Sequence, residues 1–223
     1  MCGRFTCAAP SEIVAEVFGL AEPVALAPRF NVAPTQPVAV VRWQEGGRYL
    51  SLVRWGLIPG WATDAGVGAR LINARAETVA VKPAFRSAFK ARRCLILADG
   101  FYEWARRGSG KQPYWIGFAD GRPFAFAGLW ERWQGSEGAV ESCTIITTAA
   151  NEVVAPLHDR MPVILPPASF APWIDSNPHD AAALPPLLRP YPPEGMVAWP
   201  VSPRVNNPRH DDPACRAPVT PFR

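Results

Sequence analysis

The sequence lacks the features that mark several large protein classes. It has only three histidines and no two cysteines in a CxxC spacing, so it offers no clustered ligand set for a metal ion. No basic segment followed by an apolar one opens the chain as a secretory leader would, and no apolar run is long enough to span a membrane. The cysteine count is odd, at five, which favours a reducing compartment. We therefore expect a cytoplasmic protein that uses no metal, no cofactor and no membrane.

Lysine is also scarce, and arginine carries nearly all of the positive charge. Lysine occurs only at Lys82, Lys90 and Lys111, although the chain has 23 basic residues against 19 acidic ones and a net charge of +4. The planar arginine fork binds a phosphate through two hydrogen bonds and stacks on nucleobases. A basic excess of this size is common among globular proteins, so it permits a nucleic-acid partner without establishing one.

Length and composition predict one domain. The 223 residues are 48% hydrophobic, which is enough for a sizeable core. The 26 prolines and 17 glycines favour short strands joined by many turns over a helical bundle. We predict a single α+β domain over residues 1–223 with a mostly antiparallel, barrel-like β-sheet core and short peripheral helices.

Local patterns predict the individual elements. Ser11 is expected to cap a helix that ends at Gly19, and further helices are expected at residues 83–90 and 169–174 and after Asp180. Apolar runs predict strands at residues 38–43, 49–55, 71–76, 93–98, 101–104, 114–118, 124–130, 143–148 and 161–165. Asp99-Gly100 is expected to form a turn, and residues 29–34 and the C-terminal tail are expected to be loops.

The most distinctive chemistry lies at the start of the chain, Met1-Cys2-Gly3. A small second residue permits removal of Met1, which would leave Cys2 with a free α-amine beside its thiol. In model compounds the amine titrates near ~8 and the thiol near ~8.5, so modest tuning makes both nucleophilic at neutral pH. Such an aminothiol forms a Schiff base with an aldehyde and then closes a five-membered thiazolidine ring, which an internal cysteine cannot do because its nitrogen is an amide. The alternative is an ordinary buried cysteine.

Arginine recurs two positions after three polar residues. The pairs are Cys2 with Arg4, Asn73 with Arg75, and His158 with Arg160. In an extended chain, residues i and i+2 lie on the same face, so each polar residue would present an arginine beside it. A cleft that holds a sugar between two phosphates needs this arrangement. Coincidence in an arginine-rich chain is the alternative.

Three side chains suit proton transfer and positioning. By strand alternation Glu103 shares a face with Phe101, and a carboxyl group among apolar rings favours its protonated form, as a general acid requires. His158 stands in a proline-flanked loop where its proton is available for acid–base chemistry, and Asn73 both donates and accepts hydrogen bonds. The alternatives are a surface or ion-paired glutamate and a packed histidine.

These segments together resemble the SRAP family, the SOS response-associated peptidases or abasic site processing proteins. The resemblance covers nearly the whole chain in order. The matching segments begin with Met1-Cys2-Gly3-Arg4-Phe5, Arg29-Phe30-Asn31-Val32-Ala33-Pro34 and Trp55-Gly56-Leu57-Ile58-Pro59. They continue with Ile72-Asn73-Ala74-Arg75-Ala76-Glu77-Thr78, Asp99-Gly100-Phe101-Tyr102-Glu103-Trp104, His158-Asp159-Arg160-Met161-Pro162 and Val201-Ser202-Pro203-Arg204-Val205-Asn206-Asn207.

The resemblance implies a sensor of abasic sites in single-stranded DNA. It implies a covalent thiazolidine crosslink through Cys2 after removal of Met1, with lyase-like chemistry and autoproteolytic removal of Met1 by the same site. Asn73, Glu103 and His158 match the assisting residues. The DNA-binding positions implied in this way are Arg4, Asn31, Trp61, Arg75, Arg86 and Arg160. The expected protein is a monomer that joins the nucleoid when it binds DNA.

Two other functions fit parts of the sequence. An N-terminal-nucleophile amidase or peptidase also begins with Met-Cys-Gly, and there the α-amine acts as general base for the thiol. That reading predicts release of ammonia from glutamine. A non-covalent binder of single-stranded DNA would use the arginines alone, and it would form no adduct for a Cys2 substitution to remove.

Overall fold

The computed structural model describes residues 2–44, 46–108, 110–136, 138–174 and 183–221. Met1, His179 and residues 180–182, at the start of the helix predicted after Asp180, lie outside the described residues, and the described chain directly beyond them forms only the short 3-10 helix Pro185–Leu187. Among the described residues no helix is both long enough and apolar enough to cross a membrane.

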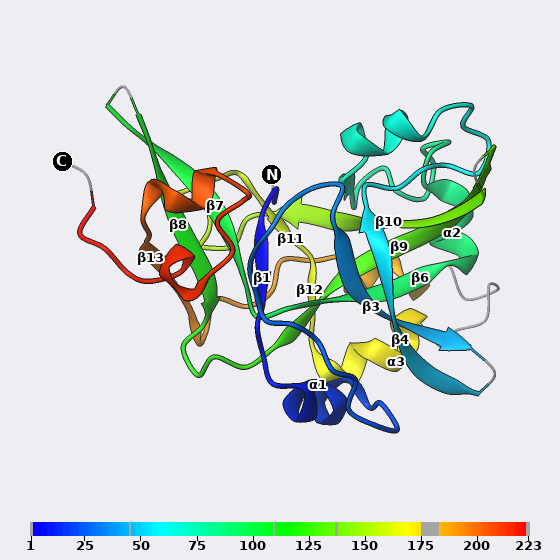
Figure 1. Cartoon of the computed structure of the whole chain (residues 1–223), viewed down its shortest axis with the longest axis horizontal. Coiled ribbons are helices and arrows are strands. Elements are labelled where there is room, and N and C mark those ends of the chain that lie inside the picture. The colour runs from blue at the N-terminus through cyan, green and yellow to red at the C-terminus, as the bar shows by residue number, and fades with distance from the viewer. Residues whose placement is uncertain (1, 45, 109, 137, 175–182, 222–223) are drawn as a thin grey trace.

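A closed five-stranded barrel forms the larger half of the molecule (Figure 1). Its strands are β3 (Pro37–Gln44), β4 (Gly47–Trp55), β6 (Arg93–Ala98), β9 (Phe124–Gly135) and β10 (Gly138–Ala149). The ring runs β10-β4-β3-β6-β9 and closes where β9 pairs with β10. All of these pairings are antiparallel except that of β10 with β4. Three short strands extend the ring, β5 (Asn73–Arg75) and β11 (Arg160–Pro162) along β10 and β12 (Ile164–Leu165) along β9.

A second, antiparallel sheet stands beside the barrel. Its order is β13 (Met196–Pro200), β8 (Gly110–Phe118), β7 (Gly100–Arg107), β1 (Phe5–Cys7) and β2 (Arg29–Val32). Figure 1 shows the N-terminus entering between this sheet and the barrel. Gly100 must stay small here, because a Cβ on it would lie 2.2 Å from the Trp115 ring of the neighbouring strand.

The inside of the barrel is identified by contacts that cross it. The guanidinium of Arg42 in β3 hydrogen-bonds Glu141 in β10 at 2.7 Å and lies 4.4 Å from the ring of Trp130 in β9, although β3 pairs with neither strand. Only the concave face allows such contacts. Alternate residues of the barrel strands, among them Val40 of β3 and Ile96 of β6, belong to the core cluster that also contains Cys2. This core therefore connects the barrel interior with the N-terminal residue.

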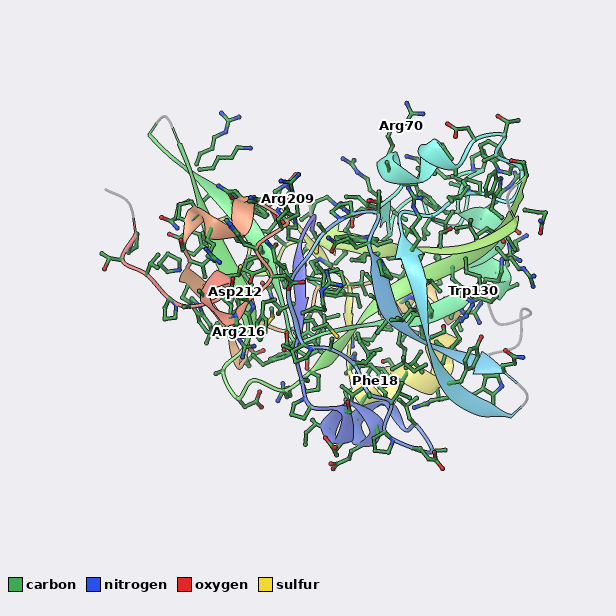
Figure 2. All side chains as sticks on the ribbon, in the orientation of Figure 1. Phe18, Arg70, Trp130, Arg209, Asp212 and Arg216 are labelled. Carbon is green, nitrogen blue, oxygen red and sulfur yellow. The ribbon has the colours of Figure 1, made fainter. Side chains whose placement is uncertain are left out.

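The helices are short and cover the outer face of the barrel. They are α1 (Ser11–Phe18), α2 (Arg86–Ala91) and α3 (Phe170–Ile174), with single 3-10 turns η1 (Ala65–Arg70), η2 (Pro167–Ser169), η4 (Pro185–Leu187), η5 (Pro203–Asn206) and η6 (Pro213–Cys215). Apolar side chains from the three α-helices pack with outward residues of β3, β6 and β9 in one cluster. Phe18 of α1, labelled in Figure 2, points toward the barrel. Its ring stacks on that of Phe170 in α3, with ring centroids 5.3 Å apart.

The predicted fold class, a single α+β domain with a mostly antiparallel barrel-like core and short helices, is confirmed. Several local predictions are wrong. Residues 29–34 and the C-terminal tail contain β2 and β13, because partner strands rather than their own proline-rich patterns make them extended. Asp99-Gly100 is no hairpin turn, since β6 and β7 belong to different sheets.

Other corrections concern element ends. Ser11 is the first helical residue of α1 instead of its cap, which is Pro10, whereas Gly19 ends the helix with a positive φ of 64° as predicted. The strand predicted at residues 161–165 is divided, because β11 pairs with β10 while β12 pairs with β9. β9 and β10 run further than predicted and pair up to Gly135 and Gly138.

Candidate active site

Two neighbouring strands of the second sheet bring the start of the chain and Glu103 together. β1 pairs antiparallel with β7 through Phe5 opposite Phe101, and continuing this register places Gly3 opposite Glu103. The side chain of Glu103 is almost fully buried, at 3% exposure, and faces the cluster of Phe101 and Cys2. Strand alternation had predicted this face, because Tyr102 lies in a separate cluster on the other side.

Asn73 anchors the N-terminal residue from the barrel side. Its Nδ2 donates a 2.9 Å hydrogen bond to the backbone carbonyl of Cys2. Asn73 is the first residue of β5, which pairs in parallel with β10 at Ile145. Its Oδ1 is buried and has no hydrogen-bond partner among the described residues, so it is available to a group arriving at Cys2.

His158 reaches the same place from the turn before β11. The turn is closed by backbone bonds from the His158 amide to the Val154 carbonyl at 3.0 Å and by Asn151, whose Oδ1 accepts from the Val154 amide. The His158 Nδ1 accepts a 3.0 Å hydrogen bond from the Arg160 backbone amide. The same nitrogen lies 2.8 Å from Asp159 Oδ1, and the two groups form an ion pair when the ring is protonated.

Burial sets the protonation states of the site. Burial raises the pKa of Glu103 above its ordinary value, and the positive charge of His158 opposes this rise only in part. Burial also raises the pKa of the Cys2 thiol far above its usual range, and the negative charge of Glu103 raises it further. The resting site therefore holds a neutral thiol beside a carboxyl group that retains its proton more readily than an exposed glutamate does.

The site meets the surface on the side of Asn73 and His158. Cys2 has no exposed surface in the chain that still carries Met1, whereas Gly3 and Asn73 are partly exposed and the His158 side chain is 29% exposed. Cys2 is therefore fully buried beside residues that reach the surface.

Arg4 and Asn31 form their hydrogen bonds with other residues of the protein. Arg4 Nη1 donates to Asn31 Oδ1 at 2.9 Å and to the Val205 carbonyl at 2.6 Å. Asn31 has no exposed surface, and its Nδ2 donates to the carbonyls of Val205, Asn207 and His210. Both side chains thus fasten the C-terminal segment onto β1 and β2.

Three of the other predicted DNA-binding residues are exposed, and the fourth, Arg160, is mostly covered. Arg75 follows Asn73 in β5 and is exposed, Arg86 begins α2 and is exposed, and Trp61 is 66% exposed. Arg160 is mostly covered, because its guanidinium forms two hydrogen bonds with the Glu77 carboxylate. Of the three arginines two places after a polar residue, Arg75 and Arg160 therefore flank the site while Arg4 supports the fold.

Sequence reasoning missed two exposed arginines and the partner of Arg160. Figure 2 shows Arg70 projecting from the end of η1, three residues before Asn73, and Arg209 lies just beyond the Asn206 segment that Arg4 holds. Both residues are exposed. In the sequence Glu77 is part of the motif at residues 72–78 and has no predicted role. Its pairing with Arg160, 83 positions away, has no local signal.

The described residues contain no group of three or more His, Cys, Asp and Glu side chains that could hold a metal ion. All five cysteines carry free thiols, and Cys94 and Cys143 are fully buried in the barrel core.

Comparison with known proteins decides the family. The family model for the SOS response associated peptidases, SRAP, matches residues 1–208. The chain belongs to the SRAP family. The match begins at Met1, one residue before the candidate nucleophile Cys2, and includes Asn73, Glu103 and His158. SRAP membership was the prediction made from the sequence, and it is confirmed.

Several curated relatives share a name. The abasic site processing protein YoqW of Bacillus subtilis is 41% identical over 218 residues, which cover 96% of this chain and 97% of that protein. The abasic site processing protein YedK of Escherichia coli is 34% identical over 184 residues, or 78% of this chain and 79% of that protein. The chicken abasic site processing protein HMCES is 34% identical over 197 residues, or 77% of this chain and 58% of that protein.

A solved structure shares the fold throughout. The crystal structure of a protein from Bacteroides thetaiotaomicron matches this SRAP chain with a TM-score of 0.87 at 27% identity. The alignment covers 98% of this chain and all of that one. The barrel and the adjoining sheet are therefore the shared architecture of the match rather than a local similarity.

Proposed function

We propose that this protein processes abasic sites in single-stranded DNA by forming a thiazolidine crosslink through Cys2 after removal of Met1. The observation that carries the proposal is the convergence of three elements on the N-terminal residue. Asn73 holds the Cys2 carbonyl, and Glu103 and His158 interact electrostatically with the same site. The names of the relatives supply the substrate class.

Binding comes first in the proposed sequence. Exposed Arg75, Arg86 and Arg70 attract the backbone phosphates, and exposed Trp61 stacks against a base. These contacts hold the deoxyribose of the abasic site over Cys2, so the later steps take place within one complex. Arg4 and Asn31 have a supporting role in this scheme, because they hold the C-terminal segment.

In the proposed chemistry Glu103 first donates a proton and later accepts one. The abasic sugar opens to its aldehyde, and the Cys2 nitrogen adds to the carbonyl carbon. Protonated Glu103, assisted by His158, donates a proton to the departing hydroxyl, and water leaves an iminium. The Cys2 sulfur closes the ring on the iminium carbon, and its proton passes to the Glu103 carboxylate. The net change is aldehyde plus aminothiol giving thiazolidine plus water.

The pKa shifts of the site suit this cycle. A raised pKa favours the protonated form of Glu103 for the dehydration step, and a raised thiol pKa keeps the Cys2 proton on sulfur until the iminium is present. The amine therefore attacks before the sulfur does. An N-terminal-nucleophile amidase has the opposite requirement, since its sulfur must attack first.

Removal of Met1 is a second proposed activity of the same site. The family description includes peptidase, and the scissile bond precedes the residue whose carbonyl Asn73 holds. We propose that Cys2 attacks this bond with Glu103 and His158 as proton carriers. We further propose that the protein is a cytoplasmic monomer that joins the nucleoid with its DNA.

The proposed domain extends past the matched residues to the end of the chain. Asp211 accepts hydrogen bonds from the Arg29 side chain and from the backbone amides of Phe30 and Asn31. Cys215 is fully buried, and the Val219 amide donates to the Pro200 carbonyl at 2.9 Å. Residues 209–221 therefore belong to the same folded unit.

Mass spectrometry of the intact protein tests the proposal. After mixing with a single-stranded oligonucleotide that carries one abasic site, the protein lacking Met1 should gain the oligonucleotide mass minus one water. The same strand with an intact base should give no adduct. No adduct with either strand, together with release of ammonia from glutamine, would instead establish the amidase.

Binding should depend on Arg75 and on salt. We expect Arg75→Ala to weaken binding of an intact single strand at every salt concentration and to reduce the slope of log affinity against log salt by about 0.7, because one phosphate contact is lost. Fluorescence anisotropy titrations at several salt concentrations measure both effects. Arg122→Ala is the control, since this exposed arginine binds Asp120 in the turn between β8 and β9. An unchanged slope in Arg75→Ala would remove Arg75 from the DNA surface.

A further inference from the structure

The bidentate pair of Arg160 and Glu77 has no role in the chemistry described so far. Arg160 Nη1 and Nη2 donate to the two Glu77 carboxylate oxygens at 3.0 Å each. Such a fork-to-fork contact is the geometry in which arginine also binds a phosphate. The carboxylate thus occupies the edge of the guanidinium that a DNA phosphate would use.

Arg160 is held in place by a second set of contacts that does not involve Glu77. Its Nε donates to Thr147 Oγ1 at 3.3 Å, and its Nη2 donates to the Thr147 carbonyl at 2.6 Å. Thr147 is a fully buried residue of β10. The guanidinium therefore keeps its position through β10 even when the carboxylate leaves.

Glu77 is the more exposed partner of the pair. Its side chain is 53% exposed, whereas that of Arg160 is 12% exposed. A half-exposed carboxylate regains water when it turns away, so its separation from arginine costs little. The hydrogen bond from Arg160 lowers the pKa of Glu77, and the charge of Arg75 lowers it further, so Glu77 is fully ionised at neutral pH.

The pair lies next to the candidate active site. β5 and β11 flank β10, with Arg75 opposite Thr147 in one pairing and Arg160 opposite Ala149 in the other. His158 precedes Arg160 by two residues, and its Nδ1 accepts from the Arg160 amide. A phosphate on Arg160 would therefore belong to a nucleotide beside the reacting sugar.

We propose that Glu77 is an anionic gate, a carboxylate that occupies the phosphate-binding edge of Arg160 until a DNA phosphate displaces it. The proposal rests on the proposed function, because it takes the ligand to be single-stranded DNA. Glu77 lowers the affinity for any strand, since every strand must first displace it. Capture at Cys2 is covalent, so a strand with an abasic site is retained after the gate opens while an intact strand dissociates.

The opposite role for Glu77 is preorganisation, in which the carboxylate orients the guanidinium for DNA. The Thr147 contacts argue against it, since they already fix both Nε and Nη2. The two roles predict opposite signs, because loss of a gate tightens binding and loss of an orienting group weakens it.

The test measures binding of an intact single-stranded oligonucleotide by fluorescence anisotropy with Glu77→Gln. Glutamine keeps the size of the side chain and removes its charge. We expect roughly two- to fivefold tighter binding at moderate salt, the range of a partly exposed ion pair. Glu16→Gln, at an exposed position of α1, is the matched control for net charge. Glu77→Gln should have no effect in an Arg160→Gln background.

Three outcomes decide the question. Tighter binding by Glu77→Gln when Arg160 is present, but not in the Arg160→Gln background, supports the gate. Weaker or unchanged binding overturns it, and so does equal tightening by Glu16→Gln, which would show a general charge effect. The adduct assay with wild-type protein is run alongside. If it gives an adduct while Glu77→Gln does not tighten binding, the gate fails and the proposed function stands.

Discussion

Replacing Cys2 with alanine is expected to abolish the covalent adduct with an abasic single strand. Alanine keeps the α-amine, which can still form a reversible imine, but no sulfur remains to close the thiazolidine ring. Binding of intact single strands should change little, because the exposed arginines and Trp61 are untouched. Intact mass spectrometry under denaturing conditions measures the first effect and anisotropy the second.

Two controls make the Cys2 result specific. Cys7→Ala removes another free thiol, one that lies in β1 and is partly exposed, and it should leave the adduct intact. A protein whose Met1 is retained and acetylated should form no adduct, since the Cys2 nitrogen is then an amide. An undiminished adduct with the capped protein would show that the α-amine takes no part.

Replacing Glu103 with glutamine is expected to slow adduct formation by roughly 10²- to 10⁴-fold, the usual contribution of a positioned general acid. Glutamine keeps the shape and donates a hydrogen bond but transfers no proton. In the wild-type protein the rate of adduct formation should also fall as the pH rises and Glu103 loses its proton. The variant should not show this fall. Single-turnover kinetics over a range of pH measure both, with Glu22→Gln as an exposed control.

The same substitution should stabilise the folded protein at neutral pH. The folded-state pKa of Glu103 lies above that of an unfolded glutamate, because the carboxyl group is buried. Its protonated form therefore contributes stability that is fully present below the unfolded pKa and is lost as the pH rises through the folded value. Glu103→Gln should raise the melting temperature near neutral pH and change it little in acid. A fall in melting temperature at neutral pH would contradict the buried-acid assignment.

Much of the fold was accessible from local patterns. Strands such as 93–98 are continuous apolar runs, and Gly19 marks the end of α1 because glycine readily adopts its positive φ of 64°. β2 and β13 escaped prediction, since pairing with neighbouring strands holds these segments extended. The candidate site residues came from the sequence, through the cysteine at position 2 and through SRAP motifs, whereas the contacts among them did not.

What the sequence determined by itself is the chemistry available to this protein. A second-position cysteine makes an aminothiol possible, alternation along residues 101–104 sets the face of Glu103, and ordered motifs identify the SRAP family. Only the tertiary structure decided which arginine side chains remain exposed and which bind other residues of the protein. Arg4 holds the C-terminal segment, Arg160 holds Glu77, and Arg75 remains exposed, although all three follow a polar residue at the same spacing. Hydrogen-bond partners far away in the chain make this difference, and no local pattern encodes them.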